Sequence, residues 1–251
     1  MGATYDFGYI WVWTHGHLLP AFVFGLTAFL TRRYKWPRWT AAVSTGLALW
    51  GIGGFFIVQF AFRANQPLEL PTDRFLTSGS GRILDAGAGS GRSTLMVLLS
   101  KPGARVVALD RFSAGYGIED NSPRRLQDNM RAAGVGDRVE VLAGDMRKMT
   151  VESESFDGAV SAYAIDHLSR EGTVQALAEV ARVLRPGGDF LLIVVNRDGW
   201  VRVAYPFLHG HGYFGQEPAA DWWRALLAAA GFDIIEHGTR PGALYLLSRK
   251  R

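Results

Sequence analysis

Short apolar runs and helical patterns alternate along the chain from residue 81 to its end. The apolar runs, each typical of a buried strand, are "RILDAG", "RVVALD", "RVEVLAGD", "FDGAVSAYA", "DFLLIVVN", "FDIIEHG" and "ALYLLSR". The helical patterns are "GRSTLMVLLSK", "SPRRLQDNMRAAG", "EGTVQALAEVARVL" and "AADWWRALLAAAG", and several end at Gly as helix C-caps do. This alternation predicts an α/β fold with a doubly wound, seven-stranded sheet that is mostly parallel. Only "TRPG" separates the last two strands, which are therefore expected to pair antiparallel.

The first 64 residues have a different pattern, with two long apolar segments at Tyr9–Leu30 and Trp39–Phe62. Neither segment contains Asp, Glu, Lys or Arg, and each exceeds the roughly 20 apolar residues that a membrane-spanning helix needs. The start of the chain, "MGATYDF", has no positive charge, so a cleavable signal peptide fits poorly. A membrane-anchoring helical hairpin is predicted for residues 1–64. The alternative is a pair of buried core helices in a soluble protein.

The orientation of this hairpin poses a conflict. The linker "TRRYKWPR" is basic, which places it in the cytoplasm by the positive-inside rule. Two full crossings would then put the large C-terminal domain outside, whereas we expect that domain on the cytoplasmic side. The first segment is the weaker spanner because His15, His17 and Pro20 lie within it. Either the rule is broken or one segment is interfacial or re-entrant.

Composition narrows the possible chemistry. Of the 251 residues, 48% are hydrophobic and 20% are charged, which suits a packed core and argues against disorder. The chain has no cysteine, which excludes disulfides, thiolate metal sites and a cysteine nucleophile. Its net charge of +4 comes from scattered arginines, so no nucleic-acid partner is expected and membrane lipids remain a candidate partner. Residues 65–80 form a breaker-rich linker before a domain at 81–251.

The run "LDAGAGSG" at Leu84–Gly91 carries the main functional signal. In open α/β sheets, ligands bind beyond the carboxyl ends of the strands, where glycines allow a close approach to the backbone. A glycine-rich loop alone is weak evidence, since NAD-binding and nucleotide-sugar-binding domains use similar loops. Here Asp85 precedes the glycines, and its charge would repel a pyrophosphate but suit a cationic amino-acid ligand held through water or backbone.

From about Leu76 to Arg251 the chain resembles the class I S-adenosylmethionine-dependent methyltransferases, which have a Rossmann-like fold, and in particular their small-molecule branch. Five stretches match in order: "LDAGAGSG", "VVALD", "LAGDM", "FDGAVSAYAIDHL" and "VLRPGGDFLLI". The resemblance implies S-adenosylmethionine as cosubstrate, with Asp85 near its methionine moiety, Asp110 on its ribose and Asp145 on its adenine. Met146 is implied to pack on the adenine ring. The full implied cosubstrate set is Asp85, Gly87, Ala88, Gly89, Gly91, Asp110, Arg111, Asp145, Met146 and Ser161.

On the acceptor side, the loop after the fourth strand offers Tyr163, Asp166 and His167 as catalytic candidates. His167 would serve as a base near neutral pH, with Asp166 orienting it or holding a cationic acceptor. The alternative is that His167 opens the next helix and Asp166 is its N-cap. The long aromatic stretch Asn196–Trp223 is interpreted as a lid or binding loop, with a surface loop as the alternative. No metal site is predicted, because the two histidines of the "HGH" motif His15–His17 would point to different sides of a helix. A second "HGH", His209–His211, repeats the pattern, and nothing in the sequence shows that the two motifs meet.

These features predict a membrane-associated methyltransferase that acts on a small, lipophilic acceptor. A lipid amine, a quinone or isoprenoid hydroxyl, and a hydrophobic thiol or amine all fit. One alternative is methylation of a membrane-bound protein partner. Another is a non-catalytic membrane scaffold that keeps the methyltransferase fold. The absence of cysteine excludes thiol-dependent arsenic methylation, and "SAYA" after the fourth strand argues against amino methylation of nucleic-acid bases.

Overall fold

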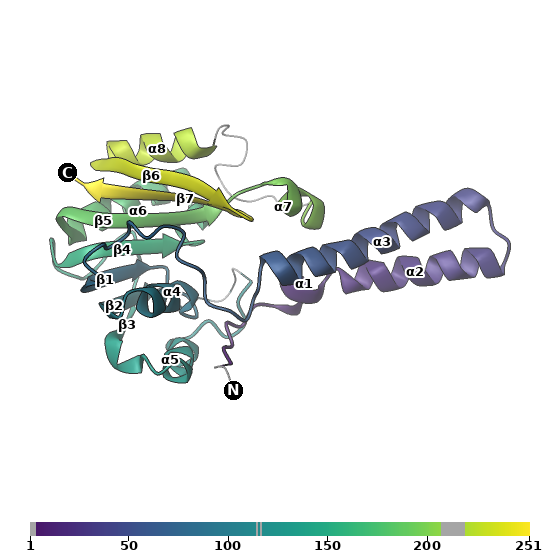
Figure 1. Ribbon diagram of the computed structural model, residues 1–251, viewed down its shortest axis with the longest axis horizontal. Coiled ribbons are helices and arrows are strands. Elements are labelled where there is room, and N and C mark those ends of the chain that lie inside the picture. Colours follow the sequence, from purple (N-terminus) through teal and green to yellow (C-terminus); the bar gives the residue numbers. More distant parts are fainter. Residues whose placement is uncertain (1–3, 114, 116, 207–218) are drawn as a thin grey trace. The chain divides into compact units, whose positions relative to one another are not determined.

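The computed structural model describes residues 4–113, 115, 117–206 and 219–251 (Figure 1). A seven-stranded sheet has the order β3-β2-β1-β4-β5-β7-β6. Its strands are β1 (Ser80–Ala86), β2 (Gly103–Asp110), β3 (Val139–Ala143), β4 (Phe156–Ala162), β5 (Leu184–Val195), β6 (Phe232–Arg240) and β7 (Ala243–Lys250). The helices that accompany them are α4 (Arg92–Ser100), α5 (Pro123–Ala132), α6 (Arg170–Val183) and α8 (Ala219–Ala229), with short 3-10 turns at Gly136–Arg138 and Ile165–His167.

Strand pairing follows the sequence prediction closely. Strands β3, β2, β1, β4 and β5 pair in parallel, so their carboxyl ends share one edge of the sheet. Strand β7 lies between β5 and β6 and pairs antiparallel with both, which confirms the antiparallel final pair. The predicted seven-stranded, doubly wound α/β fold is therefore correct for this part of the chain.

Helices cover both faces of this sheet. Along β1, Leu84 and Ala86 point into a core that also contains Leu177 of α6 and Trp223 of α8. Asp85 points to the other face, where its carboxylate accepts hydrogen bonds from residues of α4. Because side chains alternate along a strand, this places α6 and α8 on one face and α4 on the other.

The apolar N-terminal segments form α1 (Trp11–His15), α2 (Leu18–Arg33) and α3 (Arg38–Ala61). Helices α2 and α3 approach closely at two glycines. A Cβ at Gly51 would stand 2.6 Å from the amide nitrogen of Ala21, and one at Gly54 would collide with the His17 ring. A close backbone approach through small residues is typical of helix pairs in membranes.

The first apolar segment is not a single helix, contrary to the simplest interpretation of its length. A turn interrupts the helix between His15 and Leu18. Helix α2 therefore has only 16 residues, a length of about 24 Å. Helix α3 has 24 residues, about 36 Å, and is the one helix among those described that is long and apolar enough to cross a bilayer. Two membrane-spanning helices therefore remain a prediction.

The chain divides into two compact units whose boundaries differ from those predicted. The sheet unit includes residues 4–8, which precede the hairpin, as well as the linker from Asn65. The hairpin unit contains Tyr9–Ala64 and also the described residues 197–206 that follow β5, including α7 (Gly199–Ala204). The hairpin is thus an excursion from the sheet unit rather than a separate leading domain.

Within the hairpin unit, three hydrogen bonds bind α7 and its end to the N-terminal helices. The His17 ring, through Nε2, contacts the Ala204 carbonyl oxygen at 2.5 Å, and Trp50 Nε1 donates to the Val203 carbonyl oxygen at 2.7 Å. The Tyr205 hydroxyl donates to the Trp13 carbonyl oxygen at 2.6 Å. Carbonyls at the end of a helix have no partner inside it, so His17 and Trp50 supply what the last turn of α7 lacks.

Candidate functional site

The glycine loop joins β1 to α4 at the carboxyl edge of the sheet, but its three glycines serve different purposes. A Cβ at Gly87 would collide with Ala164 and the Met146 side chain, and one at Gly91 would lie 2.6 Å from Met130. These two positions require glycine because other protein atoms already occupy the space that a side chain would need. At Gly89, φ is +53°, and among the described residues a Cβ would meet only Ile118, at 3.4 Å. Gly89 is therefore the glycine whose open side a ligand would occupy.

Asp110, the last residue of β2, points its carboxylate at this loop. Its Oδ2 accepts a hydrogen bond from the Gly89 amide at 2.9 Å. Its Oδ1 accepts from the Phe112 amide at 2.6 Å and from Asn121 Nδ2 at 3.2 Å. A carboxylate has about four acceptor positions, so the described residues leave about one unused, on Oδ2 beside the loop. The carboxylate is rigidly held and keeps an acceptor for a hydroxyl donor.

Asp85 lies beneath the loop and is fully buried. Its Oδ2 accepts from the Ser93 and Thr94 hydroxyls at 2.8 and 2.6 Å. Burial raises the pKa of this carboxyl to about 6, although the two hydroxyl bonds favour its ionised form. Its Oδ1 is buried and has no hydrogen-bond partner among the described residues, so one acceptor remains for water or a cationic group.

Asp145 and Met146 follow β3 at the same edge of the sheet. Arg147 grips the Asp145 carboxylate, with Nη2 at 2.6 Å from Oδ2 and Nε at 3.0 Å from Oδ1. This bonding holds the pKa of Asp145 down at about 2, with a further contribution from Arg111. Asp145 is thus a fixed anion, and Met146 reaches the underside of Gly87.

Ser161 and Ala88, two further residues of the predicted cosubstrate set, also form hydrogen bonds within the protein. The Ser161 side chain is fully buried, and its hydroxyl donates to the Ala86 carbonyl oxygen at 2.7 Å, linking β4 to β1. The Ala88 amide donates to the Leu109 carbonyl oxygen at 3.0 Å, which ties the loop to β2. Ser161 therefore supports the end of the strand that leads into the loop, and Ala88 fixes the loop itself to β2. Arg111 is exposed just after Asp110.

The three catalytic candidates lie together in sequence but in different environments. Tyr163 ends β4 in a left-handed conformation, with φ +53°, and its amide donates to the Ile193 carbonyl oxygen at 2.8 Å. Such a conformation is uncommon for an aromatic residue and is often found at functional sites. His167 is exposed. Asp166 is buried, and its Oδ2 accepts from the Val195 amide at 3.1 Å, which caps the end of β5.

The alternative assignment for this loop is wrong. Ser169 is the N-cap of α6, and its hydroxyl accepts from the Gly172 amide at 3.2 Å. Asp166 and His167 belong to the 3-10 turn before it. Burial raises the pKa of Asp166, while the neighbouring His167 acts in the opposite direction. The buried Asp166 carboxyl therefore ties the 3-10 turn that contains His167 to the end of β5.

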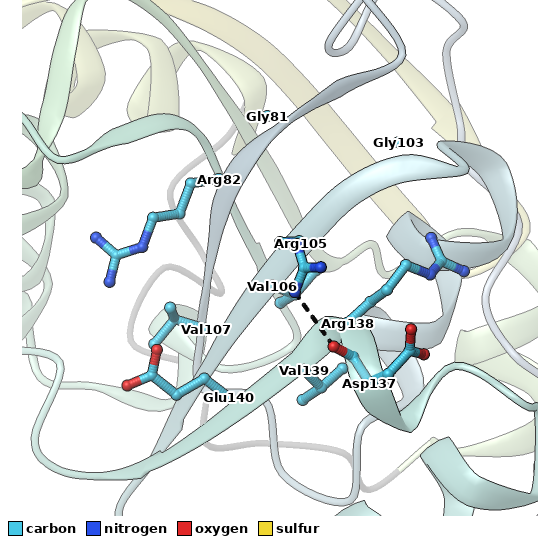
Figure 2. Close-up of a pocket in the computed structure, with 10 residues that line it drawn as sticks. All are labelled: Gly81, Arg82, Gly103, Arg105, Val106, Val107, Asp137, Arg138, Val139 and Glu140. Atoms are coloured by element: carbon cyan, nitrogen blue, oxygen red, sulfur yellow. Dashed lines mark hydrogen bonds between the residues drawn. The ribbon is translucent and has the colours of Figure 1, made fainter.

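A hollow at the opposite end of the strands is a different feature (Figure 2). It is lined by Gly81, Arg82, Gly103, Arg105, Val106, Val107, Asp137, Arg138, Val139 and Glu140. Arg138 donates to the carbonyls of Leu98 at 3.1 Å and Pro102 at 2.9 Å, so its guanidinium supports the backbone. None of the predicted site residues lines this hollow.

Part of the predicted acceptor region lies outside the described residues. His209 and His211 fall there, as do the aromatic residues Phe207, Tyr213 and Phe214. Of the first "HGH" motif, His17 is buried against α7, and the His15 ring contacts Phe55 at 5.7 Å between centroids. Within residues 4–206 and 219–251, apart from positions 114 and 116, no group of three His, Asp or Glu side chains could hold a metal ion.

Two neighbours of the loop were not predicted from the sequence. Ile118 lies over Gly89, and Asn121 holds the Asp110 carboxylate. Both come from the connection between β2 and α5, whose irregular sequence carries no periodic signal. An Asn just before a Ser-Pro helix start was the one available hint.

These groups fit the cosubstrate that the sequence resemblance implies. Gly89 offers a space that any side chain would fill, and Asp110 offers a carboxylate acceptor next to it. Asp85 supplies a buried acceptor oxygen. A nucleoside with a ribose diol and a cationic amino-acid tail would use all three.

Comparison with known proteins supports this assignment. Residues 83–188 match the protein family described as Methyltransferase domain. Demethylmenaquinone methyltransferase of Mycobacterium tuberculosis is 34% identical over 137 residues, 51% of this chain and 50% of that protein. 24-Methylenesterol C-methyltransferase 2 of Oryza sativa is 29% identical over 178 residues, 69% of this chain and 43% of that protein. The chain thus spans half or less of these two relatives.

A solved structure supports the fold. The crystal structure of an S-adenosylmethionine-dependent methyltransferase from Methanosarcina mazei superimposes with a TM-score of 0.56 at 20% identity. The match covers 73% of this chain and 99% of that one. The sheet unit therefore has the fold of these enzymes.

Proposed function

We propose that this chain is a class I S-adenosylmethionine-dependent methyltransferase that methylates a small, lipophilic acceptor at a membrane surface, since its residues 83–188 match the methyltransferase domain family. The observation that carries the methyltransferase part is the Asp110 carboxylate held beside the open side of Gly89. When bound, S-adenosylmethionine supplies a methyl group on a positively charged sulfur. The residues of this chain then have to bind the cosubstrate, orient the acceptor and exclude water.

We assign the binding roles as follows. Asp110 accepts a ribose hydroxyl, Asp85 attracts the amino-acid end, and Asp145 with Met146 borders the base. Tyr163 lines the acceptor side, since its strained backbone fixes it at the end of β4. His167 is the group that takes a proton when the acceptor nucleophile is neutral, and Asp166 holds the turn that presents it.

The hairpin unit supports a membrane surface as the place of action. Large apolar side chains stay exposed along α2 and α3, among them Phe22 at 70%, Trp39 at 68% and Phe60 at 78%. Exposed apolar surface of this kind marks an interaction site. The hydrocarbon core of a bilayer would bury these apolar side chains. The basic linker residues Arg32 and Arg33 suit anionic lipid headgroups.

The attachment of α7 to the hairpin supports a lipophilic acceptor. Residues 197–206 follow β5, where the sequence predicts the acceptor-binding stretch, and they pack with the hairpin. His17, the N-cap of α2, and Trp50 of α3 both hold the end of α7. An acceptor dissolved in the bilayer would therefore meet a segment that is anchored there. Quinone or isoprenoid hydroxyls and lipid amines are the acceptor classes we favour.

The short α2 suggests an orientation that resolves the topological conflict. A helix of about 24 Å does not cross a hydrocarbon core of about 30 Å. A hairpin that lies in the cytoplasmic leaflet keeps both the basic linker and the methyltransferase unit in the cytoplasm. Because the chain lacks cysteine, Lys35→Cys and Asp128→Cys give single labelling sites. We expect a membrane-impermeant maleimide to leave both positions unlabelled in intact cells and to label both once the cells are permeabilised. Labelling of position 35 from outside would contradict this orientation.

The experiment that tests the function is untargeted. Membranes are incubated with the full-length protein and methyl-labelled S-adenosylmethionine, with Asp110→Ala as the inactive control. We expect label in the organic extract. Label in protein would indicate methylation of a membrane partner, and no label over the control would favour a non-catalytic scaffold.

A further inference from the structure

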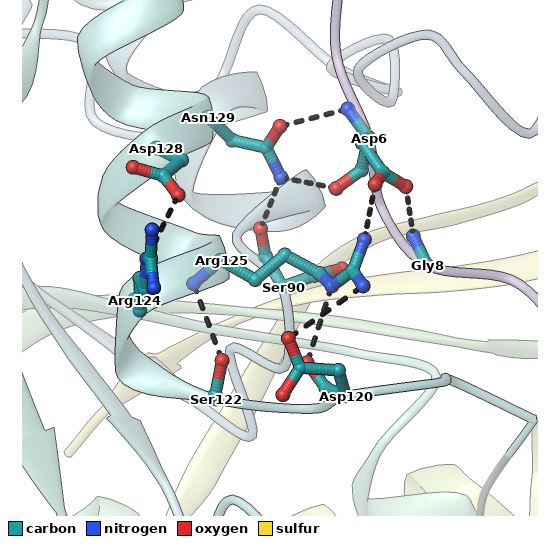
Figure 3. A network of polar contacts seen from close by, with 9 residues as sticks. All are labelled: Asp6, Gly8, Ser90, Asp120, Ser122, Arg124, Arg125, Asp128 and Asn129. Atoms are coloured by element: carbon teal, nitrogen blue, oxygen red, sulfur yellow. Dashed lines mark hydrogen bonds and ion pairs between the residues drawn. The ribbon is translucent and has the colours of Figure 1, made fainter.

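The residues that precede the hairpin are bound to the helix beside the glycine loop (Figure 3). The Asp6 amide donates to Asn129 Oδ1 at 2.9 Å, and Asn129 Nδ2 donates back to the Asp6 carbonyl oxygen at 2.8 Å. The backbone amide and carbonyl of Asp6 thus both form hydrogen bonds with the side-chain amide of Asn129 on α5. The two residues are 123 positions apart, so this pairing is purely tertiary.

The same side chain reaches the glycine loop. Asn129 Nδ2 also donates to the Ser90 carbonyl oxygen at 3.0 Å, and Ser90 lies between Gly89 and Gly91. Asn129 is buried, with 3% of its surface exposed, so these bonds are shielded from water. A buried amide that lost one of these partners would bear an uncompensated cost. Asn129 therefore links residues 5–8 to the loop at Gly89.

A second contact runs through the connection before α5. The Glu119 amide donates to the Gly8 carbonyl oxygen at 2.6 Å. Arg125 pairs with the Asp6 carboxylate and donates its Nε to the Asp120 carbonyl oxygen at 3.1 Å. Residues of this connection, Ile118 and Asn121, lie over Gly89 and hold Asp110 respectively.

A third contact is at the start of α4. Phe7 is fully buried, and the Arg92 guanidinium lies 6.0 Å from the centre of its ring. Arg92 Nε donates to the Gln66 carbonyl oxygen at 2.8 Å. Arg92 directly follows Gly91. The stretches on either side of the hairpin, residues 5–8 and Gln66, therefore both contact the first residue after the glycine loop.

From these contacts we infer that residues 5–8 are a positioning segment for the cosubstrate loop, with Asn129 as the residue that transmits their effect. The segment does not touch the cosubstrate. It fixes the Ser90 carbonyl from one side and the 118–121 connection from the other, so that Gly89 and Asp110 keep the spacing described above. The inference rests on the proposed cosubstrate binding. By linkage, a segment that strengthens cosubstrate binding must itself be stabilised when the cosubstrate binds.

The test uses full-length protein in detergent micelles and S-adenosylhomocysteine, the demethylated product, as the probe. Calorimetry compares Asn129→Ala with its neighbour Asp128→Ala, whose exposed side chain pairs with Arg124 and Arg131 of the same helix. We expect Asn129→Ala to weaken binding at least fivefold and Asp128→Ala to leave it within twofold of wild type. Equal affinities for both variants, with melting temperatures showing both folded, would overturn the inference.

Amide hydrogen exchange on the unmodified protein gives a readout that needs no variant. We expect S-adenosylhomocysteine to slow exchange at Asp6 as well as at Gly89, because Asn129 bonds both the Asp6 amide and the carbonyl of Ser90, the residue after Gly89. Slower exchange in the glycine loop with no change at residues 5–8 would refute the positioning role even if Asn129→Ala fails to fold. Failure of the proposed function looks different, because the wild type would then bind no probe at all.

Discussion

Replacing Asp110 by Ala tests the binding site most directly. In the structure, three of the roughly four acceptor positions of this carboxylate are taken by protein donors, which leaves about one for a ribose hydroxyl. A hydrogen bond to a charged group contributes about 1.5–3 kcal/mol. Losing that one bond weakens binding roughly 10- to 150-fold, at about 1.4 kcal/mol per factor of ten. Because the three donors on the protein also lose their acceptor, the upper part of this range is expected.

The assay is calorimetric titration of S-adenosylhomocysteine into purified protein, with circular dichroism and thermal melting as checks on folding. Asp137→Ala is the matched control, since it removes a carboxylate from the hollow at the other end of the strands (Figure 2). We expect the control to bind like the wild type. Unchanged affinity for Asp110→Ala would refute the ribose assignment, and a loss confined to Asp137→Ala would move the site to the hollow.

Further predictions concern the loop, the buried acid and the hairpin. Gly89→Val should abolish probe binding in calorimetry and leave the protein folded, since its side chain enters space that Ile118 alone borders in the described part of the chain; binding within twofold of wild type would contradict the open side. Burial raises the pKa of Asp85 to about 6, from 3.8, so the native state holds this proton more tightly than the unfolded chain. Stability from this group is present below pH 4 and is lost as the pH rises to 6, by about 3 kcal/mol. The free energy of unfolding, measured by urea denaturation at several pH values, should therefore fall with pH more steeply for wild type than for Asp85→Asn between pH 4 and 6. An equal pH dependence for the two proteins would contradict this. Trp50→Phe removes the donor to the Val203 carbonyl and should speed amide exchange in α7; unchanged exchange would show that this bond does not hold the helix.

Local sequence signals predicted the sheet well because turn residues and helix caps mark the ends of most elements. Helix α5 begins at Pro123 with Ser122 as its N-cap, as "SPRR" indicates. Strand β5 is the exception, since it begins at Leu184 and not at Asp189 as predicted. Its first residues pair irregularly with β4, and the intervening "RPGG" has the composition of a turn.

The arrangement of the site was less predictable than its residues. Asp110 could be placed at a strand end by pattern alone, and the structure puts it beside Gly89. The burial of Asp166 against Val195 and of Ser161 against Ala86 depends on how β4 meets its neighbours, which no local pattern encodes. The break between α1 and α2 was equally hidden, because composition measures apolar length and not where a helix stops.

The path of the chain has a practical consequence for anyone wishing to work without detergent. Residues 4–8 belong to the sheet unit, so the hairpin is an insertion into that unit. A truncated protein that starts at Asn65 would lose part of the sheet unit together with the apolar helices. A better design splices Gly8 to Asn65 through a short Gly-Ser spacer. The patch of α7 that His17 and Trp50 cover would then need polar replacements.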